Sequence, residues 1–239
     1  MTAGEFAVGN VVLFFLQQTG YPAVVFQKII QNSTIHPDFE IVRVPVTESG
    51  PSRAGRYHIT DPYLRFYFRF LADRQYQLAL GAQNIALAEI TRHMIDFIGR
   101  YTWEELCREW VLRASAFGEL SVLSDHVGSA WNSKVQIDVA GINSMEKTLV
   151  LGECKWTLSK IERKVIADLI EERAARIIPA RGKWRVYFLG FSRSGWTSGA
   201  LAYQHKINQH PVQGENWESI GLRLVTVDEL DDDMTRWTK

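Results

Sequence analysis

Short apolar and alternating runs punctuate the second half of the chain, and most of them are bounded by turn residues. Because side chains point alternately to the two faces of a strand, runs of about four to eight such residues are typical of β-strands. The run that follows Gly182 is strongly apolar. The pattern predicts strands at residues 119–124, 134–141, 148–156, 183–191 and 221–227.

Apolar residues also recur at helical spacing around these strands. After Asp61, which fits an N-cap, aromatic residues from Tyr63 to Phe70 follow the i, i+3, i+4, i+7 rule, and we interpret this stripe as core rather than as a base-stacking surface. Ser159 followed by Glu162 has the spacing of a capping box. Helices are therefore predicted from residue 62, at 75–99, 103–116 and 159–178, and from 228 in the acidic tail.

Before residue 61, two alternating runs at 40–47 and 55–60 flank a polar segment and predict a hairpin, which is how a winged helix ends. Arg53 and Arg56 lie at this wing tip and are candidates to contact a nucleic-acid backbone, although a solvated hairpin is the more common role of such residues. We predict a winged-helix-like region over residues 1–73 and an α/β (α+β) domain over residues 74–239.

Composition narrows the class of protein without identifying a partner. The 239 residues are 46% hydrophobic and 23% charged, as in ordinary globular proteins. Lys+Arg and Asp+Glu are 27 each, so nucleic acid would have to be held by a local basic patch. The densest basic stretch is 173–193, which fits a phosphate-tracking surface or a solvated helix end about equally well.

Targeting and cysteine signals point to a reducing compartment. Cys107 and Cys154 fall in a predicted helix and a predicted buried strand, so we expect no disulfide. The apolar run 11–16 is too short to span a bilayer and lacks the flanks of a signal peptide, which leads us to expect a cytoplasmic protein with no membrane partner. The six histidines show no zinc-ligand spacing with either cysteine.

Candidate chemistry gathers on two neighbouring predicted strands. Asp138 lies in the first, and Glu153 and Lys155 lie two positions apart in the second, so their side chains point to the same face. If the strands pair, the two carboxylates could hold Mg²⁺ or Mn²⁺ with the lysine at the edge of the site. The alternative is a structural ion pair with no catalytic role, which such a short pattern alone would favour.

Asp138, a hairpin and then Glu153-Cys154-Lys155 resemble the Asp…(Asp/Glu)-x-Lys signature of the PD-(D/E)XK, or restriction-endonuclease-like, nucleases. The upstream segment from Arg56 to Phe70 resembles the lead into the C-terminal module of archaeal-type AAA+/STAND ATPases, in which a winged helix precedes a domain similar to these nucleases. The segment Trp103–Glu109 is similar to the first helix of that domain, and the whole resemblance covers about residues 37–195.

The resemblance implies a restriction-endonuclease-like core of helix, three strands, helix and strand. It also implies a Mg²⁺-dependent DNA nuclease with Asp138 and Glu153 as metal ligands, Lys155 as a catalytic residue and Glu104 as a supporting carboxylate. Gln136 departs from the family pattern, which often has an acidic residue there. The rival interpretation is a non-catalytic DNA-binding or regulatory module, a stand-alone remnant of an ATPase–nuclease fusion that works with a separate ATPase partner. A homodimer is left open.

Other chemistries are disfavoured by the motifs. The chain has no Gly-x-x-x-x-Gly-Lys-(Ser/Thr) segment, so the ATPase domain of the resembled proteins is absent from it. The segment from Gly190 to Ser194 approaches a hydrolase nucleophile elbow but has serine where the second glycine is needed. We expect Ser192 and Arg193 to lie in a loop beside the metal site and to contact phosphate.

Overall fold

The computed structural model describes residues 61–238, which divide into two compact units, 61–102 and 103–238. The predicted wing with Arg53 and Arg56 lies outside the described residues, as does most of the predicted winged-helix-like region, so that domain assignment stays a prediction. Within the described part of the chain, every helix is too short or too polar to cross a bilayer.

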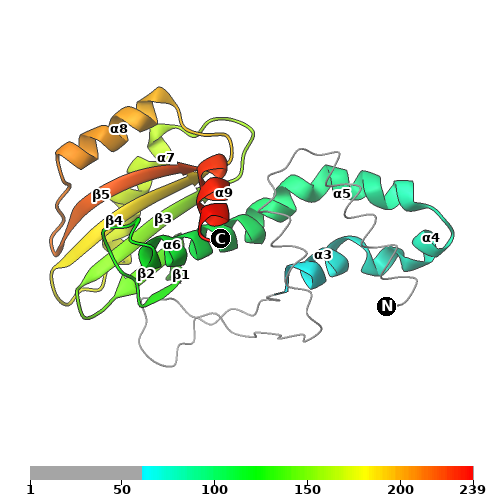
Figure 1. The fold of residues 1–239 in the computed structure, drawn as a ribbon, viewed down its shortest axis with the longest axis horizontal. Helices are drawn as coiled ribbons and strands as arrows, with labels where there is room; N and C mark the ends of the chain where they lie inside the picture. Colours follow the sequence, from blue (N-terminus) through cyan, green and yellow to red (C-terminus); the bar gives the residue numbers. More distant parts are fainter. Residues whose placement is uncertain (1–60, 239) are drawn as a thin grey trace. The chain divides into compact units, whose positions relative to one another are not determined.

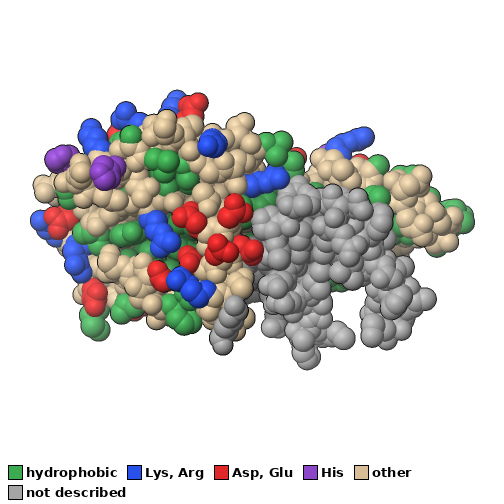
Figure 2. Space-filling view, turned by 45° about the horizontal axis from the view of Figure 1, so that its top comes forward, with side chains coloured by type: hydrophobic (Ala, Val, Ile, Leu, Met, Phe, Trp, Pro, Cys, Tyr) green, Lys and Arg blue, Asp and Glu red, His purple; other side chains and the backbone are tan. Residues whose placement is uncertain are grey.

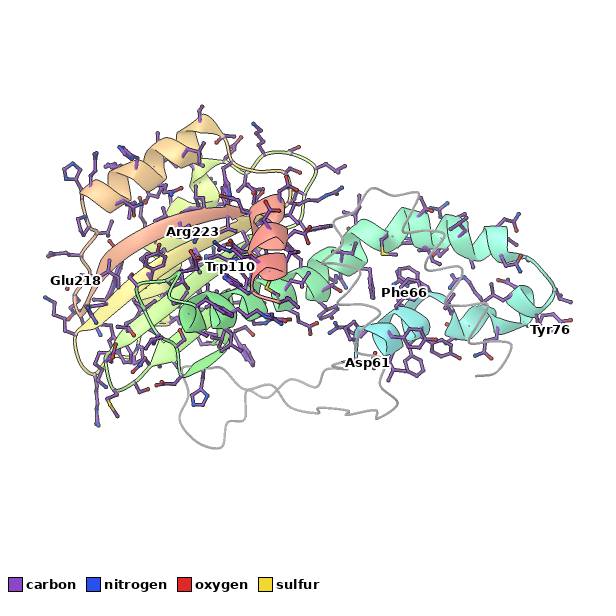
Figure 3. The ribbon with its side chains drawn as sticks, in the orientation of Figure 1. Asp61, Phe66, Tyr76, Trp110, Glu218 and Arg223 are labelled. Atoms are coloured by element: carbon purple, nitrogen blue, oxygen red, sulfur yellow. The ribbon has the colours of Figure 1, made fainter. Side chains whose placement is uncertain are left out.

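The first unit is helical. Helix α3 (Pro62–Phe70) begins at the N-cap Asp61, whose carboxylate accepts a hydrogen bond from the Leu64 amide at 3.0 Å. Its aromatic stripe forms the core of this unit, because the rings of Phe66, Phe70 and Phe97 lie 5.1 to 5.9 Å apart between centroids (Figure 3). The remaining elements are η1 (Ala72–Arg74), α4 (Gln75–Ala79), α5 (Gln83–Phe97) and η2 (Ile98–Thr102).

The second unit is built on a five-stranded mixed sheet in the order β1-β2-β3-β4-β5 (Figure 1). The first three strands form an antiparallel meander, and β3, β4 and β5 run parallel. The sequence explains the change of direction, since a tight turn joins antiparallel neighbours whereas parallel neighbours need a helical crossover. The strands are β1 (His126–Trp131), β2 (Gln136–Asn143), β3 (Thr148–Lys155), β4 (Trp184–Ser192) and β5 (Trp217–Thr226).

Helices cover both faces of the sheet (Figure 1). One face carries Leu151 and Phe188, which belong to a core cluster with residues of the crossover helices. These helices are α7 (Arg163–Ala167), the π-helical turn η3 (Asp168–Arg173), the 3₁₀ turn η4 (Ala174–Arg176) and α8 (Ser198–Gln209). The other face packs against α6 (Trp103–Ala116) and α9 (Val227–Arg236).

On the α6 and α9 side, a polar contact joins three elements around Trp110, which is fully buried. Its indole N–H donates to a carboxylate oxygen of Asp233 at 3.0 Å, and the Arg223 guanidinium lies 5.1 Å from its ring centroid (Figure 3). Trp110, Arg223 and Asp233 belong to α6, β5 and α9 respectively. This contact ties α6, β5 and α9 together on one face of the sheet.

The predicted α+β class is confirmed, and so is the predicted order of helix, three strands, helix and strand.

The strand prediction at 119–124 is wrong, because β1 runs from His126 to Trp131. Leu120 and Val122 produced the alternation, and both are buried, but they lie in an irregular segment rather than in the sheet. Strand β5 begins at Trp217, four residues before the predicted start, and helix α8 was not predicted at all.

Two helix predictions need correction. The helix expected over 75–99 is interrupted at Gly81, which takes a left-handed φ of 80°. The helix expected over 159–178 begins only at Arg163, with Glu162 as its N-cap and no side-chain capping bond, so the predicted capping box is wrong. The reason is tertiary: the Ile161 backbone donates to Gly195 O and accepts from the Thr197 amide, both at 3.0 Å, so it pairs as an extended bridge instead of entering a helix.

Candidate functional site

Strand pairing brings the predicted acidic residues to one place. Val139 and Gly152 form a pair at the end of the β2–β3 ladder, and Asp138 and Glu153 are the next residue on each strand. The pairing of β1 with β2 shifts register between Gly128 and Ala130, so β2 is irregular beside Asp138. The carboxylate of Asp138 accepts a hydrogen bond from the Cys154 amide at 3.0 Å, which fixes it against the end of β3.

Asp138 carries the clearest electrostatic signature of the site. Burial, together with the negative charge of Glu153, raises the pKa of its carboxyl group from 3.8 to about 6. The hydrogen bond from the Cys154 amide and the positive charges of Lys155 and Arg173 act in the opposite direction but do not cancel the shift. Asp138 therefore lies close enough to Glu153 for the charge of Glu153 to disfavour ionisation of Asp138.

Glu153 is held between two cationic side chains. Glu153 as a whole is only 4% exposed, and one of its carboxylate oxygens lies 2.5 Å from the Lys155 ammonium. Burial tends to lower the pKa of Lys155, but the ion pair and hydrogen bond with Glu153 outweigh it, so the pKa of the lysine is raised. The predicted proximity of Glu153 and Lys155 is present in the structure, and Lys155 is charged at neutral pH.

The second cation is Arg173, which the sequence did not single out for this site. Its guanidinium lies 2.8 Å from the other carboxylate oxygen of Glu153 and donates to the Gln136 carbonyl at 3.2 Å. It reaches the site from η3, in the crossover between β3 and β4. Its only signal in the sequence was membership of the basic stretch 173–193.

Glu104 is linked to the site through another residue. It lies on α6, where its carboxylate is 3.4 Å from the Arg108 guanidinium. Arg108 in turn donates to the main-chain carbonyl of Asp138 at 2.8 Å. Glu104 thus orients an arginine that clamps the backbone of β2. Sequence reasoning missed Arg108, although its i, i+4 spacing from Glu104 is visible in the chain.

The loop after β4 lies next to the end of β3 and contains Arg193, whereas Ser192, which was also expected in the loop, is the last residue of β4. The Arg193 amide donates to the Lys155 carbonyl at 3.1 Å, and its guanidinium lies 5.1 Å from the centroid of the Trp156 ring. Ser192 is fully buried and its hydroxyl donates to the Gly195 carbonyl at 2.9 Å. In this arrangement Ser192 shapes the loop, and contact of these residues with phosphate stays a prediction.

For a hard cation such as Mg²⁺, the site offers two carboxylates, those of Asp138 and Glu153. Over residues 61–238 no group of three or more His, Cys, Asp or Glu side chains is arranged to hold a metal ion. The neighbouring carboxylates of Asp138 and Glu153 are the kind of oxygen ligands that Mg²⁺ uses, since it takes one or two carboxylates and completes its shell with water and substrate oxygens. Cys107 and Cys154 are free thiols and both are buried.

The face shown in Figure 2 carries no single large basic patch over the described residues. On the view in Figure 2, acidic and basic side chains are interspersed over the unit that carries the sheet. In the predicted basic stretch, Arg173 is committed to Glu153, and Arg176 lies 3.9 Å from Glu172. Two arginines of that stretch therefore already have acidic partners.

Comparison with known proteins finds a family model that is similar to part of this chain, and the matched part includes most of the site. Residues 67–166 match the model of the family DUF234, described as "Archaea bacterial proteins of unknown function". The matched segment contains Asp138, Glu153 and Lys155 and ends before Arg173. The chain is thus similar, over this segment, to a family found in archaea and bacteria.

A curated relative is similar to a longer segment. The uncharacterized protein MJECL04 of Methanocaldococcus jannaschii is 27% identical over 137 residues. The match covers 56% of this chain and 30% of the archaeal protein, so the chain spans about a third of the length of that relative. No solved structure gives a significant match to the chain.

Proposed function

We propose that this chain is a Mg²⁺- or Mn²⁺-dependent nuclease of the PD-(D/E)XK type that hydrolyses phosphodiester bonds in DNA. The observation that supports this best is the meeting of Asp138, Glu153 and Lys155 at the end of the β2–β3 ladder. The order of the elements around the sheet is also the one expected for that superfamily. DUF234 has no described activity that argues for or against the proposal.

The residues present fit a divalent cation. Mutual repulsion with Glu153 contributes to the raised pKa of Asp138, and a cation shared by the two carboxylates would relieve that repulsion. Asp138 and Glu153 would hold the ion. When bound, it would lower the pKa of a water molecule and polarise a phosphoryl oxygen.

The protein's own side chains have distinct tasks in this proposal. The Cys154 amide keeps the carboxylate of Asp138 at the end of β3. Lys155 stays protonated beside Glu153 and is 35% exposed in its side chain, so it can donate to a phosphate oxygen or stabilise a nucleophile. Arg108, held by Glu104, fixes the main chain of Asp138 and thereby the geometry of the pair.

One observation favours the rival function, a non-catalytic DNA-binding or regulatory module. Glu153 is already paired with Lys155 and Arg173, so side chains alone compensate its negative charge. In that case the chain would act through DNA or through a separate ATPase partner, as the resembled fusion proteins suggest, and as a homodimer if two copies associate. In either case we propose that it acts in the cytoplasm, where its free thiols stay reduced.

Cleavage assays separate the two functions. Single-stranded, duplex and branched DNA would be incubated with the protein and Mg²⁺ or Mn²⁺, beside the variants Asp138→Ala and Lys155→Ala. We expect cleavage by the parent and a loss of about 10²-fold or more in each variant, because each removes a group that acts on the reacting phosphate. Lys160→Ala, which removes an exposed lysine five residues after Lys155, is the matched control and should cleave as the parent does.

An inert parent that still binds DNA would contradict the nuclease proposal. The rival function then predicts that binding weakens with salt and is the same in Asp138→Ala and in the parent, because the acidic residue would have no part in it.

A further inference from the structure

Arg173 lies where it can affect both the cation and the substrate of the proposed site. Its guanidinium bridges the two strands that carry the acids, since it contacts Glu153 on β3 and the Gln136 carbonyl on β2. Its side chain is 23% exposed, whereas that of Glu153 is 6% exposed. The arginine therefore contacts a buried carboxylate while part of its own side chain reaches solvent.

The charges of the cluster already cancel without a metal ion. Asp138 and Glu153 supply two negative charges when ionised, and Lys155 and Arg173 supply two positive ones. A divalent cation would leave this small, partly buried site with a double positive excess, which is unfavourable unless a cationic side chain leaves or an anion enters. Each phosphate of a nucleic-acid backbone is such an anion.

Arg173 is the cation that is better placed to move. Lys155 lies on the central strand β3, but Arg173 ends the π-helical turn η3, directly before the 3₁₀ turn η4. Helical geometry thus changes at this residue, and single π turns inside helices occur frequently at functional sites. A guanidinium also matches a phosphate with two parallel N–H donors, which an ammonium cannot do.

We propose that Arg173 is a substrate-binding residue for the phosphodiester. In the free protein its guanidinium pairs with the carboxylate of Glu153, and a divalent cation bound to that carboxylate displaces it. This inference rests on the proposed function and adds a regulation to it. The free protein binds the cation weakly, because Arg173 competes for Glu153. The cation and the nucleic-acid backbone then bind together, since Arg173 released from Glu153 takes a phosphate as its new partner.

The first test is Mn²⁺ binding by the full chain without DNA, measured by isothermal titration calorimetry. We expect Arg173→Gln to bind Mn²⁺ about tenfold more tightly than the parent, because one neighbouring positive charge changes a partly buried equilibrium by about that factor. Arg176→Gln is the matched control: it removes the same charge from the adjacent turn, where the side chain is 52% exposed and 3.9 Å from Glu172, and should leave the affinity unchanged.

The second test is binding of a short DNA duplex, with Lys155→Ala added to every variant to stop turnover. In Mn²⁺, we expect Arg173→Gln to bind the duplex about tenfold more weakly than the Lys155→Ala parent, whereas in EDTA the two should bind alike, because Arg173 is then committed to Glu153. Arg173→Lys guards against a folding defect. It keeps the charge, so Mn²⁺ affinity should match the parent, but it loses the paired donors, so duplex binding in Mn²⁺ should fall.

The outcomes separate this inference from the function on which it rests. If Asp138→Asn abolishes Mn²⁺ binding while Arg173→Gln leaves it unchanged, the role of Arg173 is refuted and the metal site stands. If Arg173→Gln raises Mn²⁺ affinity without weakening duplex binding in Mn²⁺, Arg173 is a counterion only and the substrate role is refuted. If Asp138→Asn leaves Mn²⁺ binding intact, the metal site itself fails, and the inference fails with it.

Discussion

Replacing Asp138 by asparagine should stabilise the protein at neutral pH. The folded state raises the pKa of this carboxyl group from 3.8 to about 6, so folding binds a proton there between these two values. The unfolded chain, whose carboxyl group has its ordinary pKa, releases that proton at lower pH. The parent therefore loses stability as the pH rises from about 4 to about 6, and the loss is complete above the folded pKa.

The size of the effect follows from the shift. A difference of about 2 pKa units corresponds to about 3 kcal/mol of unfavourable free energy when Asp138 is ionised in the folded protein. Asparagine carries no charge, and its side-chain oxygen can still accept the hydrogen bond from the Cys154 amide. Its amide group must find new partners, which costs about 1 kcal/mol, so we expect a net gain of about 1 to 2 kcal/mol at pH 7.5.

Urea unfolding of the parent and Asp138→Asn from pH 4 to pH 8 measures this directly. At pH 4 the charge penalty is small and the cost of the amide group remains, so the variant should be slightly less stable than the parent; the difference should change sign as the pH rises and reach its full value above pH 6. Asp125→Asn, at an exposed position before β1, is the control and should show no such growth. A variant that is less stable than the parent by the same amount at every pH would refute the electrostatic reasoning.

Three further substitutions test the packing and capping that support the site. Gly190→Ala should destabilise the protein by about 1 to 3 kcal/mol, because the added methyl group would lie 2.5 Å from the Trp196 ring and 2.8 Å from Ile166; a melting temperature equal to the parent's would show that the core can relax. Gly199→Ala in α8 meets only a side-chain oxygen at 3.9 Å and should instead stabilise the protein by about 0.5 kcal/mol in the same thermal melts, and a loss of stability would contradict this. Thr226→Ala removes the capping box that starts α9 and should cost about 1 kcal/mol in urea unfolding, unless the helix is held by packing alone.

The acidic pair and its lysine could be predicted because the chain places them close together in sequence. Asp138 and Glu153 lie on strands joined by a tight turn, in which Asn143 accepts from the Glu146 amide at 2.9 Å. In such a hairpin the register follows from the turn, so alternation alone brings opposite residues together. The turn at Asn143-Ser144 and the limits of β2 and β3 were accordingly predicted to within about two residues.

Arg173 and Arg108 could not be predicted in the same way. Each reaches the site from a helix, and the face that a helix presents to a sheet depends on how the layers pack. The crossover is also hard to predict because Ile161 forms an isolated β-bridge with Trp196, which lies on a loop distant in sequence. Strand β1 was misplaced for a related reason: the apolar alternation lies at Leu120 and Val122, while the paired strand contains Gly128 and Ser129 and depends on its neighbour β2.

The mixed direction of the sheet has a consequence for the order in which the site is assembled. Contacts within the antiparallel meander join residues close in the chain, whereas β3 and β4 can pair only after the whole crossover has been made, and local contacts form fastest. We therefore expect Asp138 and Glu153 to meet before Arg173 arrives with η3. Until then, only Lys155 balances the negative charge of the two facing carboxylates in the folding chain. A divalent cation present at that stage could supply the positive charge that Arg173 provides later.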